Sequence, residues 1–318
     1  MLPRTITSVP AATPNTPAHE SFSADEERIR QLLDDEYAPQ VEGALIWACS
    51  GAGLWEHLET DMPLETSISV ASAPDVLMLA RLADHEPALV AEVDSNTLRV
   101  FLLANGRAEE LAGHDVDHHD YLRDDMEGRQ ESKLQAHEDA HANRFAKAAA
   151  ARLEREVQRQ DARRILLSGD EVGVPLLTSH LSPFVASRVR DTLRLPVRTA
   201  AQTLRDHALP VLERLEAEDA RDAADRMLGA ARAEGMGLVG VDELRLAFMR
   251  GQVLELLLDA GGAVDDDLAR EFVLSAARTD AAITFVPDHE GLIAAGGAGA
   301  LLRFRVGDEE ASAQALSE

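Results

Sequence analysis

The sequence predicts a multidomain α/β protein, and two observations support this fold class. Predicted helices and strands alternate along the last third of the chain, which is typical of a parallel or mixed sheet with helices on its faces. Short aliphatic runs bounded by turn residues also occur in the centre of the chain. The alternating elements are helix 242–251, strand 253–259, helix 266–278, strand 281–287, helix 289–297 and strand 300–306.

The centre of the chain contains a predicted hairpin, a long helix and a buried strand. Two β-rich runs in residues 88–106 flank the turn sequence Asp94-Ser95-Asn96. A polar stretch follows, and residues 134–160 then carry apolar side chains at helical spacing. The aliphatic run RILLSGD (164–170) predicts a buried strand. Further helices are expected at 171–180, 183–193 and 207–235, the last with Gly235 as its C-cap.

The first part of the chain predicts a tail followed by a small mixed unit. Residues 1–23 contain four prolines and no periodicity, so we expect a tail. A helix should begin near Asp25, because acidic residues follow it in the first turn. The apolar run 43–50 predicts a strand that pairs with LWEHLE across Ser50–Gly53, and residues 74–84 predict a helix.

Composition limits the classes of function. The chain has 318 residues, which suggests about two domains, and no apolar run approaches the ~18 residues of a membrane span. Its single cysteine, Cys49, excludes an internal disulfide and a zinc site built from several thiolates. We therefore expect a cytoplasmic protein that binds no membrane.

Charge is distributed unevenly along the chain. The 57 acidic and 31 basic residues give a net charge of −26, which disfavours diffuse binding to nucleic acid. Residues 140–200 nevertheless hold 11 bases against 6 acids. This segment predicts either a local basic face or a solvated helix whose charges pair with one another.

Two motifs resemble known sites, but their contexts argue against them. His137-Glu138-Asp139-Ala140-His141 matches the H-E-x-x-H zinc-protease string. Asp139 is charged where such helices are apolar, and no third ligand follows, so we expect no metal at His137 and His141. Residues 235–240 spell G-x-G-x-x-G, but a helix precedes them and a strand follows, the reverse of a dinucleotide site. No cofactor is expected.

Several stretches, taken in order, resemble the middle and C-terminal domains of archaeo-eukaryotic class-1 release factors and Pelota. They are more similar still to the bacterial branch of that superfamily. The stretches are PALVAEVDSNTLRVFLLANGRAEEL (87–111), GRQESKLQAHEDAHANRFAKAAAARLE (128–154), RRILLSGDE (163–171), VDELRLAFMRGQVLELLLD (241–259) and DHEGLIAAGGAGALLRF (288–304).

The resemblance implies a domain division and a fold for each part. A divergent N-terminal α/β domain would occupy 24–85, an RNase H-like middle domain 86–206, and a three-layer α/β C-terminal domain 207–306. Tails would occupy 1–23 and 307–318.

The resemblance also implies a site. In the family, a Gly-Gly-Gln loop enters the peptidyl-transferase centre, where its glutamine places a water beside the peptidyl-tRNA ester. The matching residues here are Gly128, Arg129 and Gln130, so an arginine replaces the second glycine. The alternative is that these residues are only the turn before a helix. The cations expected to bind rRNA or tRNA are Arg144, Lys147, Arg152, Arg155, Arg159, Arg188, Arg190 and Arg194.

The function implied is occupancy of the ribosomal A site without stop-codon reading, because residues 1–85 lack the N-I-K-S and Y-x-C-x-x-x-F motifs. Partners would be the ribosome, rRNA, peptidyl-tRNA and a translational GTPase bound by the C-terminal domain. Three hypotheses remain open: ribosome rescue with ester hydrolysis, non-catalytic hibernation or protection, and a zinc hydrolase using His137, Glu138 and His141.

Overall fold

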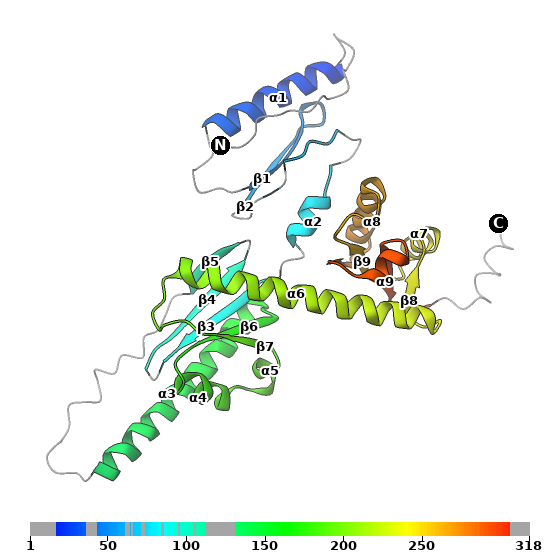
Figure 1. The fold of residues 1–318 in the computed structure, drawn as a ribbon. Coiled ribbons are helices and arrows are strands. Elements are labelled where there is room, and N and C mark those ends of the chain that lie inside the picture. The colour runs from blue at the N-terminus through cyan, green and yellow to red at the C-terminus, as the bar shows by residue number, and fades with distance from the viewer. Residues whose placement is uncertain are drawn as a thin grey trace. The chain divides into compact units, whose positions relative to one another are not determined.

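The computed structural model describes residues 17–35, 43–60, 64, 66–70, 74–83, 86–94, 96–104, 106–111 and 131–305. Within these ranges the chain forms helices and three separate sheets, so the predicted multidomain α/β class is confirmed (Figure 1). Contacts divide the chain into two units: a middle unit, residues 85–216, and an outer unit, residues 1–84 with 217–318.

The middle unit contains a five-stranded mixed sheet in the order β5-β4-β3-β6-β7. β3 pairs antiparallel with β4 and parallel with β6; β5 is antiparallel to β4, and β7 is parallel to β6. This order and these directions are those of an RNase H-like sheet. The strands are β3 (Ala88–Val93), β4 (Leu98–Ala104), β5 (Arg107–Leu111), β6 (Arg164–Gly169) and β7 (Val189–Leu193).

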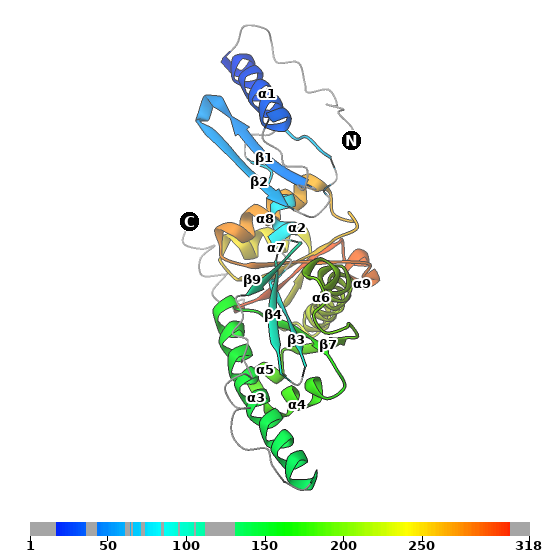
Figure 2. The same cartoon turned by 90° about the vertical axis from the view of Figure 1, so that its left-hand side faces the viewer.

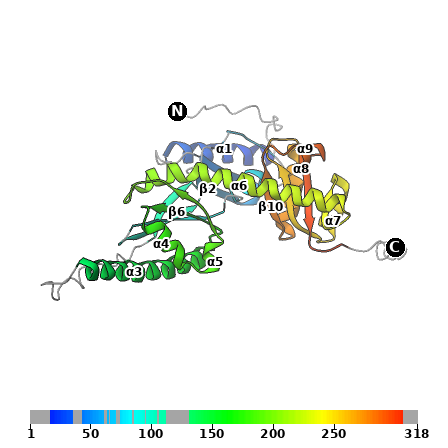
Figure 3. The ribbon, with the colours of Figure 1, turned by 60° about the horizontal axis from the view of Figure 1, so that its bottom comes forward.

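Helices cover both faces of this sheet, as Figure 3 shows. On one face lie α3 (Glu131–Gln160), α4 (Gly173–His180) and α5 (Pro183–Ala186), over a core that includes Leu89, Leu153 and Leu167. On the other face the first part of α6 (Ala201–Arg232) packs Leu204 and Ala208 against Val90, Phe101 and Leu166. Strands β3 and β6 are buried on both faces of the sheet, because successive side chains along each strand point alternately into the two cores.

A four-stranded sheet in the outer unit has the order β10-β9-β11-β8. One face packs against α7 and α8 through residues such as Phe272, and the other against α9 and the second part of α6 through Met227. The predicted three layers are therefore present. The elements are β8 (Gly237–Val239), α7 (Val241–Met249), β9 (Val253–Asp259), α8 (Asp266–Arg278), β10 (Ala282–Val286), α9 (Glu290–Ala294) and β11 (Ala298–Leu302).

The start of the chain forms a helix and a two-stranded ribbon, which lie side by side in Figure 2. Asp25 on the helix accepts a hydrogen bond from the Ser50 amide at 2.9 Å, which ties the helix to the ribbon turn. The prediction of a tail over 1–23 is wrong for its described part, because Pro17–Ser23 are helical. The elements are α1 (Pro17–Asp35), β1 (Gly43–Cys49), η1 (Ser50–Ala52), β2 (Leu54–Thr60) and α2 (Leu77–Ala83).

Three further predictions differ from the structure. Residues 189–193 form edge strand β7 rather than helix, because they pair with β6. The polar run 107–111 is a strand, since it completes the sheet edge beside β4. The long helix predicted over 207–235 begins at Ala201 and ends at Arg232. The left-handed residue after it is Glu234, with φ 53°, and not the predicted C-cap Gly235.

The division into units also differs from the predicted domain boundaries. Residues 24–84 belong to the same contact unit as 217–306, and the predicted boundary at 206/207 falls inside α6. The helix continues through this point because it supplies apolar side chains to a core of each unit. The predicted tail 307–318 lies outside the described residues. None of the helices in the described ranges is both long and apolar enough to cross a bilayer.

Acid should loosen α2 from α8. Burial alone would raise the pKa of Asp75, but hydrogen bonds from the Leu77 amide and from Arg270, with the Arg270 charge, lower it. A lowered native pKa gives stability that is present above about pH 5 and is lost as pH falls below about 4. The Trp47 indole N–H donates a hydrogen bond to the Asp75 backbone carbonyl at 2.7 Å. Trp47 fluorescence therefore reports on the surroundings of Asp75.

We expect Trp47 fluorescence, measured in a Trp55→Phe background, to change as pH falls from 5 to about 3. In the Asp75→Asn variant this acid-dependent change should be absent over the same interval. An identical titration in both proteins would show that Asp75 does not control the contact.

Candidate nucleic-acid interface

Helix α3 carries most of the predicted cations, and it begins immediately after the predicted loop. Gly128, Arg129 and Gln130 lie outside the described residues, so their geometry is not part of the structure. The α3 backbone is helical from Glu131 onward, and its side chains are described from Ala140. The described site is therefore the helix that the loop leads into.

One face of α3 is apolar and buried, and the opposite face is basic. Phe145, Leu153 and Val157 are each at most 5% exposed against the sheet. The exposed face carries cations at spacings that keep them on one side of a helix. These cations, which we call the α3 stripe, are Arg144, Lys147, Arg155 and Arg159.

The α3 stripe is not neutralised by its neighbours. Arg144, Lys147 and Arg155 make no ion pair or hydrogen bond with any described residue. Arg159 lies 3.8 Å from Glu156, which is a loose pair. A row of four exposed cations, only one of them in an ion pair with a described residue, on a protein of net charge −26 is a local electrostatic site, and it fits phosphate oxygens better than a structural role.

The other predicted cations have different surroundings. Arg152 is half-buried, and its guanidinium donates to the carbonyls of Leu98 and Leu111 at 3.3 and 3.2 Å. This arginine therefore connects α3 to strands β4 and β5, and the structure does not place it on the stripe. Arg190 and Arg194 are exposed, within and just after β7.

Sequence reasoning did not single out Phe184, which lies beside a predicted cation. Phe184 is 42% exposed, and the Arg188 guanidinium lies 3.9 Å from its ring centroid while donating to its carbonyl at 3.0 Å. An exposed aromatic ring with a stacked arginine is a surface on which bases can stack. The i, i+4 spacing of the two residues, after the Ser182-Pro183 helix start, was the available signal.

Two aspartates lie at the carboxyl ends of the neighbouring parallel strands β3 and β6, where α/β sheets commonly bind ligands. Asp94 accepts hydrogen bonds from the amides of Asn96 and Thr97, and Asp170 accepts one from the Val172 amide at 3.1 Å. Both carboxylates therefore fix turns. Within the described ranges no group of three metal-ligating side chains occurs, and the His137 side chain lies outside them.

Comparison with known proteins found a family match over the middle of the chain. Residues 74–220 match the profile of bacterial archaeo-eukaryotic release factor family 10. No curated protein matches the chain.

Three solved structures are similar at low identity. A chain from ribosome-bound archaeal Pelota and ABCE1 is 18% identical with a TM-score of 0.49, and the match covers 69% of this chain and 62% of that one. Archaeoglobus fulgidus Pelota is 16% identical with a TM-score of 0.41, covering 83% and 79%. S. cerevisiae Dom34, a translation termination-like factor that interacts with Hbs1, is 13% identical with a TM-score of 0.48, covering 80% and 76%.

The five-stranded sheet of the middle unit and helix α3 lie within residues 74–220, so this part of the chain is similar to release-factor-like proteins. The family matched is bacterial archaeo-eukaryotic release factor family 10, and the match covers a little under half of the 318 residues.

Proposed function

We propose that this protein acts in the ribosomal A site, without reading stop codons, to rescue stalled ribosomes. The observation that supports the proposal is the α3 stripe, three of whose four cations have no partner among the described residues. The stripe lies on the helix that begins directly after Gly128–Gln130, in the part of the chain that matches the family. The stripe binds rRNA or tRNA phosphates, and Phe184 with Arg188 extends the contact to bases.

Gln130 is the residue proposed to act on peptidyl-tRNA. Its side-chain amide positions a water beside the ester, and a backbone N–H of the loop stabilises the developing oxyanion. Arg129 replaces the second glycine of the family motif, and a left-handed conformation costs a non-glycine residue about 1–2 kcal/mol. We therefore propose that Arg129 contacts phosphate, in place of the close approach that a glycine would allow.

A second candidate function is occupancy of the ribosome without hydrolysis, as in hibernation or protection. The specific observation in its favour is the sequence before Gln130. Arg129 alters the motif, and Asp124, Asp125 and Glu127 bring carboxylates toward rRNA, which repels them. Both candidates share the α3 stripe and differ only in the role of Gln130. In either, the C-terminal sheet and its helices would contact a translational GTPase.

Replacing Gln130 separates the two candidates. If the protein hydrolyses the ester, the wild type releases labelled peptide from stalled ribosomes, and Gln130→Ala lowers that rate by about 100-fold. The change removes the group that positions water and leaves the α3 stripe intact, so Gln130→Ala should co-sediment with ribosomes like the wild type.

If the wild type and Gln130→Ala both bind ribosomes and both release peptide only at the background rate, the result would support occupancy without hydrolysis. Failure of the wild type to co-sediment at low salt would contradict both candidates. Arg129→Gly, which restores the family motif, serves as the matched gain-of-function control.

A further inference from the structure

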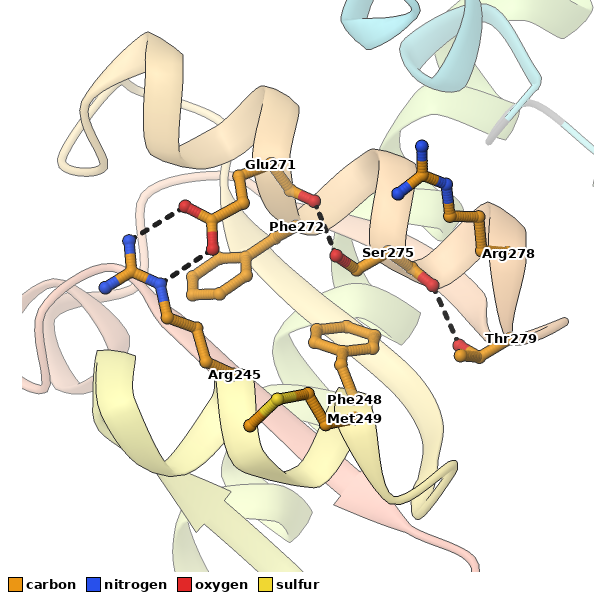
Figure 4. Close-up of a pocket in the computed structure, with 8 residues that line it drawn as sticks. All are labelled: Arg245, Phe248, Met249, Glu271, Phe272, Ser275, Arg278 and Thr279. Carbon is orange, nitrogen blue, oxygen red and sulfur yellow. Dashed lines mark hydrogen bonds and ion pairs between the residues drawn. The ribbon is translucent and has the colours of Figure 1, made fainter.

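A hollow of about 360 Å³ lies between α7 and α8 in the outer unit (Figure 4). Its floor is aromatic: the Phe248 and Phe272 rings stack with centroids 6.0 Å apart. Its rim includes Met249, which is 78% exposed and is the most exposed large apolar side chain described. Leu246, one turn earlier on α7, is also exposed. The described residues therefore leave an apolar groove uncovered.

The two hydroxyl groups in the hollow are already satisfied within their own helix. The Ser275 hydroxyl donates to the Glu271 carbonyl at 2.8 Å, and the Thr279 hydroxyl donates to the Ser275 carbonyl at 2.9 Å, as the dashed lines in Figure 4 show. No buried unpaired donor remains to orient a small polar molecule. The occupant that this lining fits is a large apolar side chain.

Charged side chains around the hollow indicate which groups of a partner would flank the inserted side chain. At one end Arg245 bridges α7 and α8, donating to both oxygens of Glu271 at 2.7 and 2.8 Å. At the other end Arg278 lines the hollow, and Arg250 follows Met249 directly after the end of α7; both arginines are exposed and have no partner among the described residues. A helix C-terminus favours an arginine, but two unpaired arginines beside an exposed methionine also complement a carboxylate-bearing partner.

The opposite end of α8 is already occupied. Arg270 donates to Asp75 at 2.8 Å, and α2 packs there with Leu77 in the core. The structure thus shows α8 receiving one short segment through an ion pair and apolar contacts. The hollow near its C-terminus offers the same combination with no described segment in place.

We propose that the groove between α7 and α8 binds an acidic amphipathic segment of a partner protein. A leucine or phenylalanine of the segment enters the hollow over Phe248 and Phe272, and carboxylates beside it pair with Arg250 and Arg278. This is a helix-in-groove interaction, with Met249 closing over the inserted side chain. The proposal does not depend on ribosome binding.

Methionine-methyl NMR on the full chain tests the location. The probe is a short synthetic helix with leucines on one face and glutamates on the other. We expect it to shift the Met249 methyl resonance and to leave that of Met227 in place, because Met227 is 0% exposed in a separate core. Titration of the same peptide, labelled with fluorescein, gives its affinity.

Variants and altered peptides test the chemistry. Met249→Glu should lower the affinity for the acidic peptide by about tenfold, and Arg278→Glu should lower it by about threefold. The matched control Ile293→Glu, at an exposed apolar position on α9, should change nothing. A peptide with lysines in place of glutamates should bind more weakly, and one with serines in place of leucines should not bind.

Four results would overturn the proposal. The first is that the acidic peptide does not bind at concentrations up to about 1 mM, and the second is that Met249→Glu leaves its affinity unchanged. The third is that single-stranded RNA binds in a way that requires Arg278 but not Met249. The fourth is peptide binding only after truncation following Arg305, which would make the chain's own last residues the occupant.

Discussion

Reversing three charges of the α3 stripe, with Arg144→Glu, Lys147→Glu and Arg155→Glu together, should weaken ribosome binding by about 100-fold at moderate salt. Each side chain is exposed and has no described partner, so the fold loses no hydrogen bond or ion pair to a described residue. Phosphate contacts release counterions, and the loss of three contacts should lower the slope of log affinity against log salt by about 3. Co-sedimentation across a salt series measures both quantities.

A matched control is needed because the triple variant makes an anionic protein six charges more negative. Arg226→Glu, Arg232→Glu and Arg250→Glu together change the net charge equally at exposed positions of the outer unit. We expect this control to keep most of the affinity and the wild-type salt slope. Equal losses in both proteins would mean that net charge, and not the α3 stripe, governs binding.

The residues of this stripe were among the cations expected from the sequence, and their common face follows from local information. Arg144, Lys147 and Arg155 follow helical spacing, and buried Phe145 and Leu153 set the opposite face. Arg152 could not be separated from them by sequence, because its partners are carbonyls of Leu98 and Leu111, more than 40 positions away. Non-local hydrogen bonds decide which arginines of a basic segment remain available.

The elements that were predicted incorrectly also depend on non-local contacts. RVRDTL carries charges that resemble a polar helix, but β6 supplies the hydrogen bonds that make Val189–Leu193 an edge strand. Helix α6 begins nine residues before Pro210, although a proline inside a helix costs about 3 kcal/mol or more. Packing of Leu204, Ala208 and Leu212 against the sheet offsets that cost.

The environment of Glu92 could not be predicted from the sequence. It lies in the strand run ALVAEV, yet its side chain is only 1% exposed. Its carboxylate accepts from Arg99 at 2.8 Å and from the Thr199 amide at 3.0 Å. Arg99 also binds both oxygens of Glu110, and this pairing raises the pKa of Arg99 and lowers that of Glu110.

Arg99→Met should therefore destabilise the middle unit by about 3–5 kcal/mol, because it leaves the Glu92 carboxylate buried with a single hydrogen bond. Both tryptophans lie in the β1–β2 ribbon of the outer unit, so their fluorescence does not report on this loss. Hydrogen exchange of peptides covering 88–104 and 164–193 measures it instead. Arg245→Met, which breaks a two-bond pair on the surface, should leave that exchange unchanged.

The double variant Glu92→Gln with Arg99→Met tests the physical cause. If the cost comes from an uncompensated buried charge, a neutral amide at position 92 should restore much of the stability that Arg99→Met removes, even though no contact is regained. If the cost comes instead from the lost contacts of Arg99 with Glu110 and with the Phe101 ring, 4.7 Å away, the double variant should be no more stable than the single one. Exchange rates in 88–104 decide between the two causes.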